Sequence, residues 1–158
     1  MAVGPHKIEY EVIKGWEQMP DGWSFFEVAG VACDSKDHVY VFNRGKYPMI
    51  IFDKEGKFLR NIWIRTGTPK LPDPRGTVWW VAFSRDPQEK YLYVMNGRNE
   101  VVTIVENESG KILSTFGRPG HQIGDFTHGH TIAVDSKGNI YVAETDTGRR
   151  VQRFKPVN

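Results

Sequence analysis

Two histidines and one arginine are the residues of this sequence whose types and spacing best suit chemistry. His128 and His130 are separated by one glycine, and on an extended strand side chains two residues apart point to the same face. Neutral imidazole binds zinc, and a catalytic zinc site usually combines three protein ligands with a water. Arg44 lies in the segment 41–45, and a guanidinium can hold a carboxylate through two parallel hydrogen bonds. The sequence therefore offers candidates for a metal site and for a carboxylate site.

These residues belong to a unit that occurs three times along the chain. In the last copy, an apolar strand, a polar turn and a second apolar strand span residues 132–143. An alanine in the first strand and a Tyr-Val pair in the second align the copies, and the aligned alanines are Ala32, Ala82 and Ala133. The spacing is thus 50 and then 51 residues. A period of this length built from strands and turns predicts the blades of a β-propeller.

The three copies predict an all-β chain with three four-stranded blades. The first two copies have a fourth strand after a Gly-Lys turn, at 56–63 and 110–116, and eleven strands are expected after residue 16. Alternation of apolar and polar residues at 8–16 predicts one more strand. We interpret it as the fourth strand of the third blade, because such closure removes open sheet edges. The chain, 1–158, is then a single domain and half of a six-bladed ring.

The number of blades leads to a prediction about assembly. Closed propellers usually have about four to eight blades, and an open row of three would expose its end faces. We predict a homodimer in which two chains form a six-bladed ring about a twofold axis. The strand at 8–16 would complete a blade of its own chain or of the partner. The alternative is that the chain is a fragment of a longer propeller.

Composition and charge argue against several functional classes. The 158 residues are 39% hydrophobic, which is enough for a core, and a formal net charge of +2 does not indicate binding to nucleic acid or a membrane surface. The basic cluster at 149–155 has acidic residues nearby, so we expect no nucleic-acid partner. No apolar span or signal-peptide pattern is visible, and a cytoplasmic location is expected. The single cysteine, Cys33, is expected to be a buried residue of an inner strand.

The third copy also carries the residues of a known repeat. Its sequence Gly-x-Phe-x5-Ile-Ala-Val-Asp-Ser-Lys-Gly-Asn-Ile-Tyr-Val-Ala-Glu at 124–144, followed by Arg-Val-Gln-Arg-Phe at 150–154, resembles the NHL repeat of six-bladed propellers. The segments Val-Phe-Asn-Arg-Gly at 41–45 and Gly-His-Thr-Ile-Ala at 129–133 resemble two motifs of the peptidyl-hydroxyglycine alpha-amidating lyases. Enzymes of that family depend on zinc and cleave a hydroxylated C-terminal glycine, leaving a peptide amide and glyoxylate.

The resemblance implies a site at the mouth of the central channel, with Arg44 and His130 in catalytic roles and zinc as the possible cofactor. The start of a blade's first strand and the turn after its second strand lie at the same end of a blade, since successive strands are antiparallel. The family has three histidines, one in each of three blades, at the position that His130 occupies in the third copy. In this sequence Ala29 and Trp79 stand at the corresponding positions of the first and second copies. Arg98 stands where the family has a tyrosine.

These departures leave two functional hypotheses open. The first is a propeller that binds a small ligand, a peptide or a protein at the channel mouth through Arg44, Trp79, Arg98 and Glu27. The second is a metal-dependent lyase or hydrolase in which His128 and His130 from two chains hold zinc. Zinc would act there as a Lewis acid.

Each candidate residue also has a purely structural interpretation. His130 can line the channel with its ring bonded to backbone, and Arg44 can be a solvated turn residue or form a salt bridge between blades. Trp79 can pack between blades instead of stacking on a ligand. Glu27 stands at the position of His128 in the first copy, and its functional role would be to orient a group that contacts the ligand or metal. The Asp-Thr-Gly triplet at 146–148 has the letters of an aspartic protease, but its polar corner would not give two carboxylates a shared proton.

Overall fold

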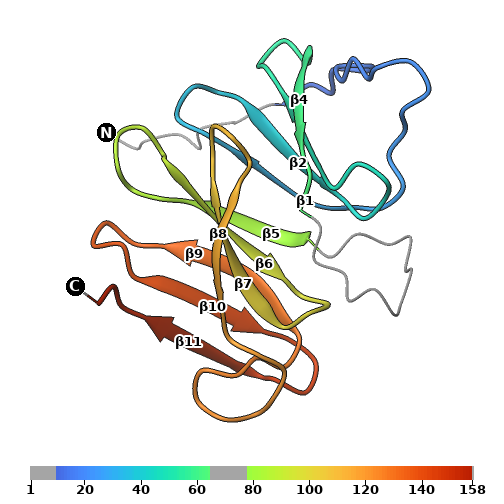
Figure 1. The fold of residues 1–158 in the computed structure, drawn as a ribbon. Coiled ribbons are helices and arrows are strands. Elements are labelled where there is room, and N and C mark those ends of the chain that lie inside the picture. The colour runs from blue at the N-terminus through green and yellow to red at the C-terminus, as the bar shows by residue number, and fades with distance from the viewer. Residues whose placement is uncertain (1–9, 65–77, 158) are drawn as a thin grey trace, which may run out of the picture.

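The computed structural model describes residues 10–64 and 78–157, and within them the fold is all-β. The strands form three antiparallel sheets that follow one another along the chain (Figure 1). The first sheet consists of β1 (Val28–Cys33), β2 (Val39–Asn43), β3 (Met49–Phe52) and β4 (Phe58–Ile62). The second consists of β5 (Val78–Phe83), β6 (Tyr91–Asn96), β7 (Val101–Glu106) and β8 (Ile112–Phe116). The third consists of β9 (Gly129–Val134), β10 (Ile140–Glu144) and β11 (Arg150–Phe154).

The eleven strands predicted after residue 16 are confirmed among the described residues, with four in each of the first two sheets and three in the third. Neighbours in sequence are neighbours in every sheet, and the described part of the chain contains the eleven expected strands. The strands are rich in β-branched and aromatic residues, which favour a pleated, half-buried surface. The first strands of the three sheets, β1, β5 and β9, lie next to one another (Figure 1). This is the arrangement of inner strands around a propeller axis, and it brings the starts of these strands to one end of the molecule.

Aspartates close several of the tight turns between strands. The Asp135 carboxylate accepts hydrogen bonds from the backbone N–H groups of Lys137 and Asn139, at 2.9 Å each. The pKa of Asp135 is lowered to about 2, mainly by the hydrogen bond that the Asn139 side-chain amide donates to its carboxylate. Hydrogen bonds from the backbone N–H groups of this turn and from the Tyr141 hydroxyl lower this pKa further. Asp34 holds the turn after β1 through the same pair of backbone bonds. Local side-chain bonding of this kind is why Asp favours turns.

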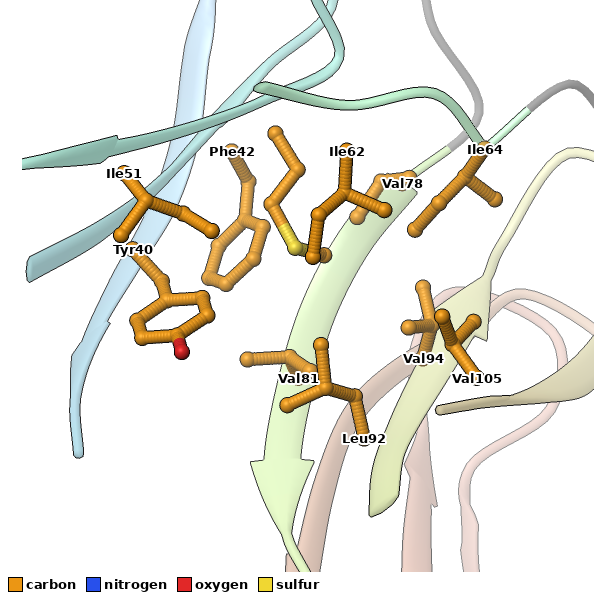
Figure 2. Packing of buried hydrophobic residues seen from close by; sticks show 11 residues of the cluster. Tyr40, Phe42, Ile51, Ile62, Ile64, Val78, Val81, Leu92, Val94 and Val105 are labelled. Carbon is orange, nitrogen blue, oxygen red and sulfur yellow. The ribbon is translucent and has the colours of Figure 1, made fainter. Parts of the chain in front are cut away.

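Apolar side chains between consecutive sheets form the core. Tyr40, Phe42 and Ile51 of the first sheet face Val81 and Leu92 of the second, and all are buried (Figure 2). A second cluster lies between the second and third sheets. Its buried members include Met95, Val102, Phe126, Ile132 and Val142. The blades are therefore packed face to face, as repeats that cannot bury a face alone must be.

The segment before β1 covers the outer face of the first sheet. The Trp16 ring packs against Phe52 with ring centres 5.7 Å apart, and its Nε1 donates to the carbonyl of Lys54 at 3.0 Å. The predicted strand at 8–16 has only residues 10–16 in the described part of the chain, and these form no strand. The third sheet has three strands in the single chain. Completion of a blade by this segment in an assembled ring stays a prediction.

One sequence-based expectation about the core is wrong. Cys33, expected to be buried, is exposed at the end of β1. Val31, on the same strand, is 52% exposed, because the covering segment before β1 does not reach this part of the outer face. Among the described residues, no helix has the length and apolar character needed to cross a membrane.

Candidate functional site

The first strand of every sheet has a β-bulge near its start. Gly129 and Thr131 pair with successive residues of β10, so His130 between them has no partner residue. The same irregularity leaves Ala29 in the first sheet and Trp79 in the second without a partner residue on the neighbouring strand. A bulge kinks the strand and redirects the extra side chain away from the regular faces of the sheet. The three positions aligned in the sequence therefore share one structural role.

Trp79 connects the blades on either side of it. Its ring lies 5.2 Å from the guanidinium carbon of Arg44 in the first blade. The ring of His130 in the third blade approaches Trp79 edge-on, with centres 5.7 Å apart and planes at 64°. A Cβ on Gly97 would come within 2.2 Å of the Trp79 ring, so the glycine is what lets the ring lie on the turn after β6. Together, Arg44, Trp79 and His130 form a continuous patch across three blades, which we call the blade-end surface.

The backbone around Arg44 is held by a buried asparagine. Asn43 ends β2, and its side chain accepts from the N–H of Phe26 at 2.8 Å and donates to the carbonyl of Tyr47 at 3.1 Å. The N–H of Arg44 donates to the carbonyl of Glu27 at 2.8 Å. These bonds fix the turn that carries the guanidinium. Sequence inspection assigned no role to Asn43.

The guanidinium of Arg44 has unused bonding capacity. Its Nη1 lies 3.4 Å from the Glu27 carboxylate, a long contact between side chains that are 31% and 48% exposed. Its Nε is buried and has no hydrogen-bond partner in the described part of the chain. A buried N–H without a partner is costly. The side chain of Arg44 therefore lies partly exposed at the blade-end surface, with its Nε donor buried and unpaired.

Two carboxylates fix the start of β9, where His130 lies. Glu100 accepts from the N–H groups of His128 and Gly129, at 2.9 and 3.1 Å. Glu144, buried at the end of β10, accepts from the N–H of Thr127 at 2.7 Å. Burial alone would raise the pKa of Glu144, but hydrogen bonds from Arg150, the Thr127 backbone and Gln152 outweigh it and lower this pKa.

The two histidines have different surroundings. His128 has a left-handed φ of 54° and His130 is the bulged residue, so the strand alternation that would place both rings on one face is interrupted. The His128 ring lies 3.7 Å from the Asp146 carboxylate, whereas His130 lies against Trp79. Among the described residues, no group of three or more His, Cys, Asp or Glu side chains could hold a metal ion. A metal site formed by two chains stays a prediction.

The remaining candidates lie close to the same patch. Glu27 contacts Arg44 as described, and Arg98 is an exposed residue that follows Gly97 in the turn under Trp79. The residues that sequence reasoning missed end the second strand of each blade: Asn43, Asn96 and Glu144. All three are polar and buried. The sequence signal for them is a polar residue at the end of the apolar second strand in each of the three copies.

Comparison with solved structures identifies the fold. The chain is similar to the hydrazine synthase of Kuenenia stuttgartiensis, with 16% identity and a TM-score of 0.53, over 80% of this chain and 33% of that protein. It is also similar to virginiamycin B lyase from Staphylococcus aureus, with 15% identity and a TM-score of 0.50, over 83% of this chain and 42% of the lyase. These neighbours have β-propeller-type folds. This chain has a β-propeller-type fold.

The comparisons give the fold and no more. A catalytically inactive form of the same lyase with Quinupristin matches at 14% identity and a TM-score of 0.50. The chain spans less than half the length of each of these proteins. No protein-family model matches the sequence, so the assignment of its blades to the NHL type stays a prediction.

Proposed function

We propose that the chain is an NHL-type propeller module that binds a carboxylate-bearing ligand, such as a peptide C-terminus, on the blade-end surface. The ligand carboxylate accepts hydrogen bonds from Arg44, and its neighbouring apolar group lies against Trp79. A charge-assisted, bidentate bond of this type is strong and directional. Tryptophan beside it supplies apolar area together with a polar N–H.

The observation that carries the proposal is the state of Arg44. Its Nε is buried without a partner in the described part of the chain, and its single side-chain ion pair there is the 3.4 Å contact with Glu27. Nearly all buried donors in proteins are paired. A ligand carboxylate that accepts from the Nη groups would replace the long Glu27 contact with a charge-assisted hydrogen bond.

The metal-dependent alternative has less support. It needs His128 and His130 from two chains, and in one chain these rings have different neighbours. If zinc were held there, it would act as a Lewis acid on a carbonyl or hydroxyl group. The residues that recognise a carboxylate would be the same in both functions, so the binding proposal does not depend on the metal.

Calorimetric titration with two peptides of one sequence tests the proposal. One peptide has a free C-terminal carboxylate and the other a C-terminal amide. We expect the free acid to bind and the amide to bind at least roughly tenfold more weakly, since a hydrogen bond to a charged group contributes about 1.5–3 kcal/mol. Arg44→Gln should remove this preference, and Arg153→Gln, a change at an exposed arginine of β11, should leave it intact. Equal affinity for both peptides would overturn the proposal.

A further inference from the structure

The first sheet presents a face that is built to receive a preceding blade. The first sheet packs on the second and the second on the third, so the first and third sheets lie at the two ends of a row (Figure 1). Val31, Val81 and Ile132 each stand directly before the aligned alanine of their copy. Val81 and Ile132 are 2% and 4% exposed because the preceding blade covers them, whereas Val31 is 52% exposed. Val31 therefore lacks the blade that covers its two counterparts.

The third sheet presents the complementary face. Ala32 packs against the cluster between the first and second sheets, and Ala82 packs against the cluster between the second and third. The aligned Ala133 is exposed, and Val151, which points to the same face, is 67% exposed. The two ends of the row are thus the two halves of the interface that joins consecutive blades inside the chain.

The segment before β1 leaves the inner part of the first sheet uncovered. Its aromatic residues pack on Val41, Ile50 and Phe52, which belong to β2 and β3. On β1, Val28 and Val31 stay 51% and 52% exposed. The contacts between blades inside the chain are made by the inner strands β1, β5 and β9. The strand that a neighbouring blade would contact first is therefore still available.

Glu100 shows how the end of one blade contacts the start of the next. This residue lies directly before β7, the third strand of the second sheet, and has a left-handed φ of 53°. Its carboxylate accepts from the N–H groups of His128 and Gly129, at 2.9 and 3.1 Å, where the third blade begins. The residue before a third strand thus reaches the start of the first strand in the next blade.

The third blade has an arginine at the position of Glu100. Arg149 lies directly before β11, the third strand of its sheet, and has a similar φ of 48°. Its side chain is exposed, donates from Nε to the Asp146 carbonyl at 3.0 Å, and forms no ion pair among the described residues. The residue of the first copy that aligns with His128 is Glu27, whose side chain is 48% exposed. The two ends of the row therefore carry opposite charges at the positions that meet in a junction.

We infer that a second copy of this chain packs its third blade against the first blade of its partner, with Arg149 of one copy paired to Glu27 of the other. Two such junctions, related by a twofold axis, join six blades, within the usual range of about four to eight for closed rings. Burial of the apolar faces supplies the affinity, and the ion pair selects which faces meet. Glu27 also contacts Arg44, so assembly adds a second guanidinium beside the blade-end surface. The junction itself does not depend on the proposed ligand.

Exchange of the two charges tests this junction. Sedimentation equilibrium of the whole chain measures the dissociation constant of the pair. Arg149→Glu and Glu27→Arg should each raise this constant at least about tenfold, because each change places like charges opposite one another at both junctions. The double variant has opposite charges again and should recover the wild-type constant. Lys111→Glu, the same change of charge at an exposed lysine directly before β8 of the middle blade, is the matched control and should have no effect.

Three outcomes would overturn the inference. The first is a folded wild-type chain that stays monomeric up to its highest soluble concentration, or that forms open assemblies of more than two chains. The second is an Arg149→Glu variant that dissociates no more readily than the wild type or than Lys111→Glu. The third is a folded double variant that does not recover the wild-type constant. Thermal unfolding identifies any loss of assembly that comes from loss of the fold. None of these measurements uses a ligand, so failure here is distinguishable from failure of the proposed function.

Discussion

Arg44 combines two features that rarely occur together in a residue with only a structural role. Its backbone is fixed by Glu27 and Asn43, yet its Nε is buried without a partner in the described part of the chain. Its guanidinium also lies against the Trp79 ring at 5.2 Å, an attractive contact that keeps the group oriented. Such a guanidinium is prepared to receive an acceptor, and this is why the carboxylate proposal rests on this residue.

Glu27 should compete with the ligand for Arg44. Replacing Glu27 with Gln removes the carboxylate that lies 3.4 Å from Nη1. Exposed ion pairs contribute about 0.2–1 kcal/mol, so we expect Glu27→Gln to tighten binding of the carboxylate peptide by up to about fivefold. Calorimetric titration measures the change. Weaker binding by the variant would show that Glu27 contacts the ligand itself instead of competing with it.

Glu144 should make the stability of the third blade depend on pH. Its pKa in the folded chain is lower than the ordinary value of 4.5, so its contribution is present above that value and is lost as the pH falls through the folded pKa. Glu144→Gln cannot ionise and leaves Arg150 without its partner at 2.7 Å. We expect the lower end of the roughly 3–5 kcal/mol cost of breaking a buried pair, since Arg150 keeps some access to water.

Urea unfolding between pH 3 and pH 7 tests this expectation. The wild-type chain should lose stability as the pH falls below about 4.5, and Glu144→Gln should lose less over the same interval. Asp146→Asn, at an exposed carboxylate near His128, is the control. Parallel pH curves for the wild type and Glu144→Gln would contradict the assignment of this titration to Glu144.

At the scale of single elements, the bulge in each first strand positions the site. The sequence alignment placed Ala29, Trp79 and His130 at one position, and each proves to be the bulged residue of its blade. The alternation rule that put His128 and His130 on one face failed, because that rule assumes an unbroken ladder. A bulge adds one residue to the strand, so the side chains before the bulge point to the opposite face of the sheet from the one that simple alternation predicts. No pattern of apolar residues in a single sequence reveals where this happens.

Gly97 should be essential for the position of Trp79. A Cβ at this position would lie 2.2 Å from ring atoms, so Gly97→Ala should push the ring off the turn after β6. We expect a clear loss of binding to the carboxylate peptide, together with an overpacking cost of about 1–3 kcal/mol. Titration and chemical unfolding measure the two effects. Normal affinity in a folded Gly97→Ala variant would show that the Trp79 ring is not part of the site.

At the scale of the whole molecule, the three copies of one sequence unit made the fold predictable. The aligned alanines and Tyr-Val pairs identified three blades, and the eleven strands in the described residues confirm them. The segment at 8–16 was less predictable, because alternation shows that a strand can form but not what it pairs with. Residues 10–16 form no strand, and Trp16 instead packs on the first sheet. Contacts such as Trp79 with Arg44 also join distant segments, so they follow from blade geometry and not from any local motif.

The outer face of the third sheet supports the proposal of a homodimeric ring. In the second sheet, Ala82 and Tyr93 pack against the next blade, whereas the aligned Ala133 is exposed and Val151 on the same sheet is 67% exposed. A second copy would cover this face with its first blade. Light scattering should then give twice the chain mass of 18.1 kDa. Val151→Arg should shift the mass toward one chain, and a folded wild-type monomer would contradict the ring.

The most direct test of the account is to determine the site at which a carboxylate ligand binds. We would follow the indole N–H resonance of Trp79 by NMR, assigned with Trp79→Phe, during titration with the free-acid peptide and with its amide. The account predicts a saturable shift of this resonance with the acid, little change with the amide, and loss of the response in Arg44→Gln. An unchanged Trp79 resonance at peptide concentrations that saturate binding would contradict it, since the ligand would then lie elsewhere.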